Sequence, residues 1–248
     1  MPDYLTYYRR QRHPGYVVGV TPPHSRYPLA ADLGLANNLY FFAADDLIDT
    51  FNNGDYVSPW IDRNGVSGTN GGIVRPTFRT NILNGLPAVR FDGSSQMLLL
   101  STQQVFGSGA WHFFSVFMTG AAVSGNYTFV SHSGTASALQ IRISSSKLDV
   151  VKSGATDLGG STTTLVTGTA YFMEATYATP NLSYYLNTVA DGTRSSAQSF
   201  TTAVNNIGKN YDGYYLNVDL CELIMCTSIQ TGAALANAQA YLKAKYNL

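Results

Sequence analysis

The sequence predicts an all-β protein, an antiparallel β-sandwich with one C-terminal helix and an extended N-terminal arm. Three observations support this fold class. From residue 39 onward, short β-like runs alternate with turns rich in Gly, Ser, Asn and Asp. The composition favours strands and turns, with 17 Tyr and 23 Gly and only 12% charged residues. Helical periodicity is found only at the C-terminal end of the chain.

Residues 1–38 differ from the rest of the chain. Five of the nine prolines fall within the first 28 positions, together with four arginines and five tyrosines. Proline disfavours both a helix and a central strand there. A frayed terminus is the ordinary alternative, but disordered tails are poor in aromatic and β-branched residues. We therefore expect an arm outside the sandwich that docks on a neighbouring chain through Tyr7, Tyr8, Arg9, Arg10, Arg12, Tyr16, Val17 and Val18.

Residues 39–248 form the predicted domain. Ten runs have strand character: 39–43, 88–92, 97–100, 111–118, 127–132, 138–144, 147–151, 170–177, 182–189 and 214–227. The run LQIRIS alternates apolar and polar residues, as expected for a sheet with one wet face, whereas HFFSVFM is almost entirely apolar. Ten strands without intervening helices predict two packed antiparallel sheets, a sandwich or jelly roll.

A helix is predicted over residues 231–246. Apolar residues recur there at helical spacing: Leu235, Ala238, Leu242 and Tyr246. Thr231 is suited to cap the start, and Lys243 and Lys245 suit the negative end of the helix dipole. The helix is expected to close the domain against the sandwich.

The stretch NGLPAVRFDGSSQMLLL, residues 84–100, places Arg90 and Asp92 on either side of Phe91. It is either a catalytic carboxylate beside its base or a strand that ends in a tight turn. The turn is favoured because Gly93 permits it and Asp92 can accept backbone N–H bonds within it. Phe91 is then expected to point into the core while Arg90 and Asp92 face the other way.

Charge and cysteine content limit the partners. Fifteen basic and fifteen acidic residues cancel, so no overall field attracts nucleic acid. The first ten residues lack the apolar segment of a secretory signal, and no apolar run approaches the ~18 residues of a membrane span.

Cys221 and Cys226 lie five apart on one predicted strand, so we expect them on opposite faces, as free buried thiols of a protein made in a reducing cytosol.

No catalytic, metal-binding or cofactor-binding motif stands out, so the chain is not predicted to be an enzyme. A retaining glycosidase needs two carboxyls about 5–5.5 Å apart, and no acidic pair lies at positions i and i+2. The nearest approach is Asp219 and Glu222, whose spacing of three is expected to place them on opposite faces. A pair of carboxyls assembled from two different strands stays open. The scattered histidines are His13, His24, His112 and His132. The acidic clusters Asp45–Asp46–Asp49 and Asp62–Asn64 lack EF-hand spacing and are expected to be solvated loops.

Taken in order, several phrases resemble the concanavalin A-like, laminin-G-type jelly roll, in the style of phage virion and bacterial surface proteins. Trp60 and Asp62 match its Trp-x-Asp turn, and residues 87–93 match its P-A-V-x-F-D-G strand. Tyr185 and Asn187 match its Y-x-N-G hairpin, although Thr188 replaces the usual Gly. The end of the chain matches a Glu-bearing strand followed by a helix that ends YL-x-x-K-Y, at Glu222, Tyr241, Leu242, Lys245 and Tyr246.

The resemblance implies two functions. The first is a virion structural protein, such as a capsid decoration or tail component, made in the host cytoplasm and docked on the major capsid or another virion protein, as a homo-oligomer for which a trimer is the guess. The second is a carbohydrate-binding module that attaches to a cell-surface glycan through exposed aromatic residues. Trp60 is expected to anchor a turn and Trp111 to lie in the core, so the candidate sugar contacts are Tyr184, Tyr185, Tyr214 and Tyr215.

Overall fold

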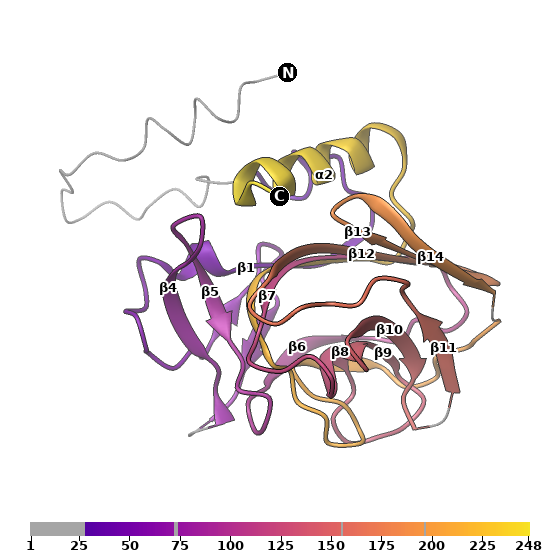
Figure 1. The fold of residues 1–248 in the computed structure, drawn as a ribbon, viewed down its shortest axis with the longest axis horizontal. Coiled ribbons are helices and arrows are strands. Elements are labelled where there is room, and N and C mark those ends of the chain that lie inside the picture. Colours follow the sequence, from indigo (N-terminus) through magenta and orange to yellow (C-terminus); the bar gives the residue numbers. More distant parts are fainter. Residues whose placement is uncertain (1–27, 72–73, 155, 196) are drawn as a thin grey trace.

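The computed structural model describes residues 28–248, apart from residues 72–73, 155 and 196. Within this part the chain forms two antiparallel sheets packed face to face, with one long helix lying on the outside of the first sheet (Figure 1). The predicted all-β sandwich with a C-terminal helix is confirmed. The partner-binding residues expected in the arm, from Tyr7 to Val18, lie outside the described residues.

Sheet 1 is centred on two long apolar strands. In the described residues its order is β14–β13–β12–β7–β16–β5–β4, and β1 pairs with the second half of β16. The bounds are β1 Asn38–Ala43, β4 Thr77–Leu83, β5 Leu86–Arg90, β7 Trp111–Thr119, β12 Ala170–Ala178, β13 Asn181–Leu186, β14 Val189–Ser195 and β16 Val218–Cys226. Both faces of β7 and β16 are covered, which explains why their sequences are apolar at nearly every position.

Sheet 2 forms the opposite layer. Its order in the described residues is β11–β10–β9–β8–β15–β6–β3–β2. The bounds are β2 Trp60–Ile61, β3 Ser67–Thr69, β6 Leu98–Gln104, β8 Asn126–Ser131, β9 Leu139–Ser144, β10 Lys147–Lys152, β11 Thr156–Gly160 and β15 Val204–Ile207. The alternation in LQIRIS is observed on β9, where Leu139, Ile141 and Ile143 face sheet 1.

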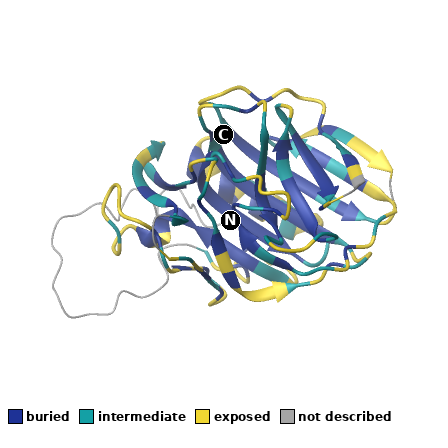
Figure 2. Ribbon diagram, turned by 90° about the horizontal axis from the view of Figure 1, so that it is seen from below, coloured by how far each residue is buried: buried dark blue, intermediate teal, exposed yellow. Residues whose placement is uncertain are grey.

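The main core lies between the two sheets and is rich in aromatic rings. Figure 2 shows that much of both sheets is buried. Trp111 is fully buried in it, as predicted. Trp60 is fully buried as well, and its indole N–H donates to the Ala43 carbonyl at 3.3 Å. Phe113 and Phe117 pack edge-on against Phe129 from the other sheet. These contacts fix the spacing of the two layers.

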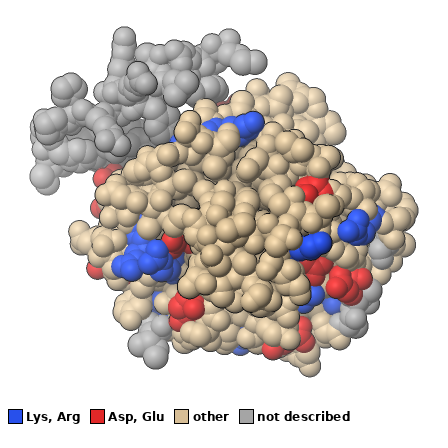
Figure 3. Space-filling view, in the orientation of Figure 1, with Lys and Arg blue, Asp and Glu red and all other residues tan. Residues whose placement is uncertain are grey.

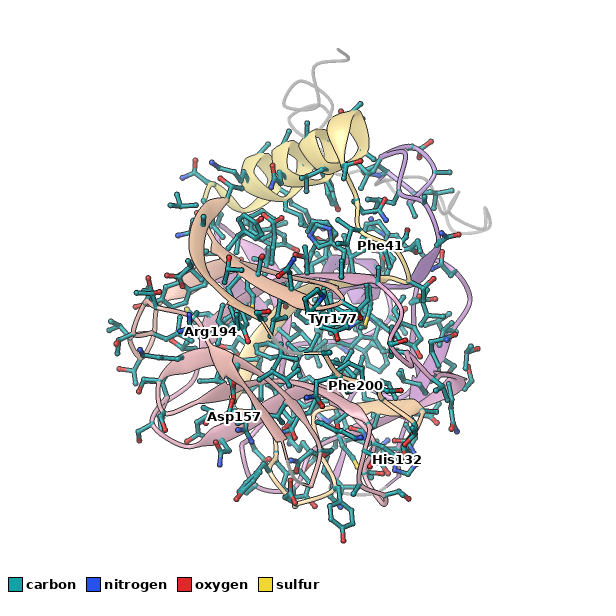
Figure 4. The ribbon with its side chains drawn as sticks, turned by 90° about the vertical axis from the view of Figure 1, so that its right-hand side faces the viewer. Phe41, His132, Asp157, Tyr177, Arg194 and Phe200 are labelled. Carbon is teal, nitrogen blue, oxygen red and sulfur yellow. The ribbon has the colours of Figure 1, made fainter. Side chains whose placement is uncertain are left out.

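A second core lies between sheet 1 and helix α2, Gly232–Tyr246. Ala238, Tyr241, Leu242 and Tyr246 are its helical members, and Phe41 faces them from β1 (Figure 4). Thr231 occupies the N-cap position, but its side chain makes no capping hydrogen bond, contrary to the prediction. Among the described residues, no helix has the length and apolar character needed to cross a bilayer.

The stretch 84–100 is a strand that ends in a turn. Phe91 is buried in the main core, while Arg90 points to the other face and pairs with Asp219 of β16 at 2.7 Å. Asp92 Oδ1 accepts the backbone N–H groups of Ser94 and Ser95, each at 2.9 Å, and Gly93 has φ of 76°. The predicted architectural role of this charge pair is confirmed, although Arg90 binds Asp219 and not Asp92.

Two sequence expectations are wrong at β16. A bulge between Leu220 and Glu222 places both Cys221 and Glu222 on the side of α2, so Cys221 and Cys226 belong to the same core and not to opposite faces. The same bulge brings Asp219 and Glu222 onto one face. Both cysteines are free and buried. Five residues of strand span roughly 16 Å, which is too long for a disulfide.

The described part of the predicted arm is also different. Residues 28–37 fold against the domain, and Ala30, Leu33 and Leu35 are buried in the core beneath α2. Gln230 ties this segment to the end of the last loop, because its side chain binds both the N–H and the carbonyl of Ala36 at 2.9 Å. The packed domain therefore begins before residue 39.

Candidate functional site

The four tyrosines predicted to contact sugar are not equivalent. Tyr184 on β13 is 1% exposed and points into the main core, so its ring is not available to a ligand. Its hydroxyl accepts the N–H of Val150 at 3.1 Å and donates to the Gly159 carbonyl. Tyr185, the next residue, is half-buried on the opposite face of the strand. Tyr184 is thus a correction to the predicted site, because its alternating position on the strand turns it inward.

Tyr214 and Tyr215 lie in the loop that connects β15 to β16, and not on a strand as the sequence suggested. Tyr214 is 39% exposed. Tyr215 is half-buried, and the Lys209 ammonium lies 5.3 Å from the centre of its ring. Of these two tyrosines, Tyr214 presents more of its surface to solvent.

A third tyrosine at this loop, Tyr211, was not singled out from the sequence. It occupies the turn Asn210–Gly213, which is closed by the Gly213 N–H on the Asn210 carbonyl at 3.3 Å. The Asn210 side chain also accepts the N–H of Tyr214 at 2.8 Å, and Gly213 has φ of 82°. Tyr211 is 48% exposed. The phrase N-Y-D-G-Y could have identified it, because Asn and Gly at these positions are typical of a tight turn with a side chain at its tip.

Tyr211 lies beside two neighbouring loops. A Cβ built on Gly154 would lie 2.7 Å from the Cβ of Ala136 and 3.8 Å from Cδ1 of Tyr211. Gly154 follows β10, and Ala136 lies between β8 and β9. We call Tyr211, Ala136 and Gly154, together with Tyr214 from the same turn as Tyr211, the tyrosine platform. Ala136 and Gly154, which form its floor, carry no long side chain.

The loops under the platform are tied to one another by backbone hydrogen bonds. Ser137 donates its N–H to the Ser153 carbonyl at 2.7 Å and accepts the N–H of Thr201 at 3.1 Å. The Thr202 hydroxyl donates to the Ala136 carbonyl at 2.6 Å. These bonds connect the loop of Ala136 with the loop of Gly154 and with residues 201–202, so the floor beside Tyr211 is held in place without a ligand.

His132 follows β8 and leads into the loop that carries Ala136. Figure 4 shows it on the side of the sandwich away from α2. Its Nδ1 accepts the N–H of Gly134 at 3.0 Å, and partial burial lowers the pKa of its imidazole. The ring is therefore neutral at pH 7, and its Nε2 carries the proton as a hydrogen-bond donor.

The residues that match the C-terminal motif of the resemblance form a buried charge network beneath α2. Lys245 Nζ lies 2.8 Å from both Asp45 and Glu222, and 3.0 Å from the Tyr241 hydroxyl. Tyr246 donates its hydroxyl to Glu222 at 2.9 Å. Burial opposes the charge on Lys245, but Asp45 and Glu222 outweigh it and raise its pKa. These side chains are enclosed and bind one another, so the network holds the helix and not a ligand.

A second buried cluster involves His112 on β7. Its Nε2 lies 3.4 Å from Glu174 Oε2, and its Nδ1 accepts the N–H of Gln230 at 3.2 Å. Gln239 of α2 donates to both oxygens of Glu174, at 2.9 and 3.1 Å. Burial lowers the pKa of His112, so the ring is neutral. His112 and Glu174 are each 1% exposed on their side chains, which closes this cluster to solvent.

The expectation that the acidic clusters are solvated loops is wrong for Asp45 and Asp62, which are buried and serve as structural anchors. Asp45 belongs to the network beneath α2, and Asp46 pairs with Arg63 at 2.9 Å. Asp62 accepts the backbone N–H groups of Phe41, Asn64 and Val66. Within the described residues, no group of three or more His, Cys, Asp or Glu side chains is arranged to hold a metal ion.

No protein-family model matches the chain, and no curated protein matches it in sequence. Solved structures share its fold at low identity. Domain 4 of AbnA, a GH43 extracellular arabinanase from Geobacillus stearothermophilus in complex with arabinotriose, has a TM-score of 0.58 and 13% identity, over 82% of this chain and 98% of that domain. The chain has a TM-score of 0.55 and 8% identity to the receptor binding domain of botulinum neurotoxin D, over 82% of this chain and 52% of that one.

A sialidase of Trypanosoma rangeli gives a TM-score of 0.52 and 10% identity, over 88% of this chain. The chain spans only 35% of the sialidase and about half, 52%, of the neurotoxin domain. At identities this low the likeness concerns the fold and not the chemistry of any site. The chain has the β-sandwich fold that these carbohydrate-associated and receptor-binding domains share.

Proposed function

We propose that the chain is a non-enzymatic binding module that recognises a glycan at the tyrosine platform. The observation that carries the proposal is the exposed ring of Tyr211, held on a floor without large side chains. An exposed aromatic ring offers a large, rigid apolar face at low entropic cost. The C–H face of a sugar ring can lie on it, while the surrounding polar groups bind the hydroxyls.

The neighbours of the platform suit a polar ligand, with the exposed Asp212 carboxylate of the turn as one further acceptor. The loop 133–137 supplies small polar side chains, and His132 adds one neutral ring. Figure 3 shows charged side chains scattered over a largely uncharged surface in that view. The likeness to the arabinanase domain, which was solved with arabinotriose, supports a glycan ligand.

The described carboxyl groups support a module without retaining-glycosidase activity. Two carboxyl pairs assembled from different strands or loops do occur, Asp45 with Glu222 and Asp149 with Asp157. The first pair is buried and bridged by Lys245. The members of the second lie within hydrogen-bonding reach, closer than the about 5–5.5 Å that a retaining glycosidase needs.

The test is a glycan array probed with the full chain, followed by titration of any glycan that binds. We expect Tyr211→Ala and Tyr214→Ala each to weaken binding about tenfold or more, which corresponds to about 1.4 kcal/mol. Tyr56→Ala is the matched control, because Tyr56 is 43% exposed but lies before β4, outside the platform. An array without binding, or equal losses for Tyr56→Ala and Tyr211→Ala, contradicts the proposal.

A second candidate is the virion structural protein, docked through residues 1–27 on a major capsid or other virion protein in a homo-oligomer, with a trimer as the guess. The composition of this segment supports it, because four of its residues are Arg and five are Tyr. An extended peptide of that kind can add a strand to a sheet edge, and Arg can bind carboxylates in a bidentate way.

This candidate is tested by comparing the full chain with a chain that starts at residue 28. We expect light scattering to give a higher mass for the full chain, and particles to incorporate only the full chain. Equal masses and equal incorporation contradict a docking role for the arm. Neither result depends on glycan binding, so the two candidates are separable.

A further inference from the structure

The strand register places two carboxyl groups on the same face of sheet 2, Asp149 on β10 and Asp157 on β11, where they are hydrogen-bonding neighbours. Val151 is the register partner of Asp157, and a bulge separates that pair from the pair made by Asp149 and Gly160. In the described residues β11 is the outermost strand of the sheet on this side. A bond between the two carboxyls therefore joins the edge strand to the body of the sheet.

The buried member of the pair lacks one hydrogen-bond donor. Asp149 is 4% exposed, and its Oδ2 binds the Arg142 guanidinium at 2.8 Å. Its Oδ1 is buried and has no donor among the described residues. Asp157 is exposed, and its Oδ1 accepts the N–H of Gly159 at 2.6 Å. Two ionised carboxylates have only acceptors, so a hydrogen bond between them requires one proton.

Charged and titratable groups from neighbouring strands of both sheets lie near this pair. They are Arg142 on β9, Lys147 on β10, Tyr184 on β13 and Arg194 on β14. Tyr184 bridges Val150 and Gly159 at the bulge, and Arg194 lies against Gly159, with its Nε 3.0 Å from where a Cβ would stand. Figure 4 shows Asp157 and Arg194 on the same side of the molecule.

We propose that Asp149 and Asp157 share one proton and act as a carboxyl clasp, which holds edge strand β11 closed at acidic pH and releases it as the pH rises. When the proton leaves for solvent, two negative charges face each other where only Arg142 binds directly. The β10–β11 turn contains Gly154, part of the floor under Tyr211. The clasp would thus regulate the tyrosine platform, and that consequence rests on the proposed function.

The sign of the pH dependence follows from the direction of the pKa shift. Burial raises the pKa of Asp149 to about 6, with Arg142 opposing the rise and Asp157 adding to it. An unfolded aspartate titrates near ~3.9, so the closed state binds the proton more tightly than the open state. The stabilisation is complete below pH ~3.9 and is lost as the pH rises through about 6.

The clasp is tested by hydrogen–deuterium exchange of the full chain between pH 5 and pH 8, corrected for intrinsic exchange. The peptide covering Thr156–Gly160 is expected to exchange about tenfold faster at pH 8 than at pH 5. The central strand β12, Ala170–Ala178, is the internal reference and should not change. Equal protection of Thr156–Gly160 at both pH values overturns the proposal.

A variant separates the shared proton from other effects of pH. Asp157→Asn keeps an acceptor for Gly159 and donates an amide hydrogen to Asp149 at every pH, so its β11 should stay protected. Asp55→Asn is the control, because Asp55 is also exposed and accepts a backbone N–H, from Asn52 at 2.7 Å. It should retain the pH dependence of the parent chain. An unchanged pH dependence in Asp157→Asn overturns the clasp.

Two further results are decisive. If calcium chloride restores the protection of Thr156–Gly160 against exchange at pH 8 in the parent chain, the pair is a cation site and the shared-proton proposal is wrong. If glycan binding is absent at both pH values while exchange follows the expected course, the clasp stands and the proposed function fails. If the clasp fails and glycan still binds through Tyr211, only the regulation is lost.

Discussion

Lys245 belongs to the C-terminal motif of the resemblance, and in the fold it holds helix α2 against sheet 1. Its ammonium lies between Asp45 and Glu222 under α2, with Tyr241 and Tyr246 completing the hydrogen bonds. A buried charge is tolerated only when it is paired and hydrogen-bonded. Each member of this network therefore depends on the others, and the helix is held in a single position.

We expect Lys245→Met to lower the free energy of unfolding by about 3–5 kcal/mol, because it leaves two buried carboxylates without their cation. The control is Lys243→Met in the same turn, whose ammonium is only half-buried and contacts Thr188 at 3.4 Å. Its effect should be within about 0.5 kcal/mol. Denaturation in urea measures both variants. Equal losses for the two lysines contradict a stabilising role for the network.

At the scale of elements, the bulge in β16 decides which side chains meet. It turns Cys221 and Glu222 to the same side, so that Glu222 reaches Lys245 while Leu220 and Leu223 still face sheet 2. A strand without the bulge would place Glu222 in the main core, whose described members are hydrophobic. Bulges of this kind re-aim side chains at functional or structural junctions.

The two cysteines test this arrangement. Burial raises the pKa of Cys226 to about 11 and that of Cys221 further, so neither thiol is ionised at pH 7. We expect no reaction with a thiol reagent in the folded protein and full reaction of both thiols in denaturant. An intact mass measured without reductant should show two free thiols. Rapid labelling of either cysteine in the folded protein contradicts its placement under α2.

At the scale of the whole molecule, the fold has three layers, namely sheet 2, sheet 1 and the layer made by α2 with residues 28–37 (Figure 1). The outer layer covers the apolar outer face of sheet 1. It leaves the platform end of the sandwich uncovered. The candidate glycan site and the covered face therefore lie on different parts of the domain.

Truncation can locate the start of the folded domain. A chain that starts at residue 38 should be less stable than one that starts at residue 28 by about 3–6 kcal/mol, because it loses buried Leu33 and Leu35. Thermal unfolding of the two truncated chains is the measurement. The same melting temperature for both would place the boundary at residue 38.

Sequence and tertiary structure contributed differently to this protein. The period-two runs, the turn residues and the single helical repeat were sufficient to predict the sandwich, the C-terminal helix, the Asp92 turn and the burial of Trp111, because these features depend on local geometry and hydrophobic pattern. The sequence did not predict the bulge at Cys221, the inward position of Tyr184 or the meeting of Asp149 with Asp157. Those depend on register between strands. The turn of Tyr211 has a local signal in the phrase N-Y-D-G-Y, but its contact with Gly154 does not, since the two residues lie more than fifty positions apart.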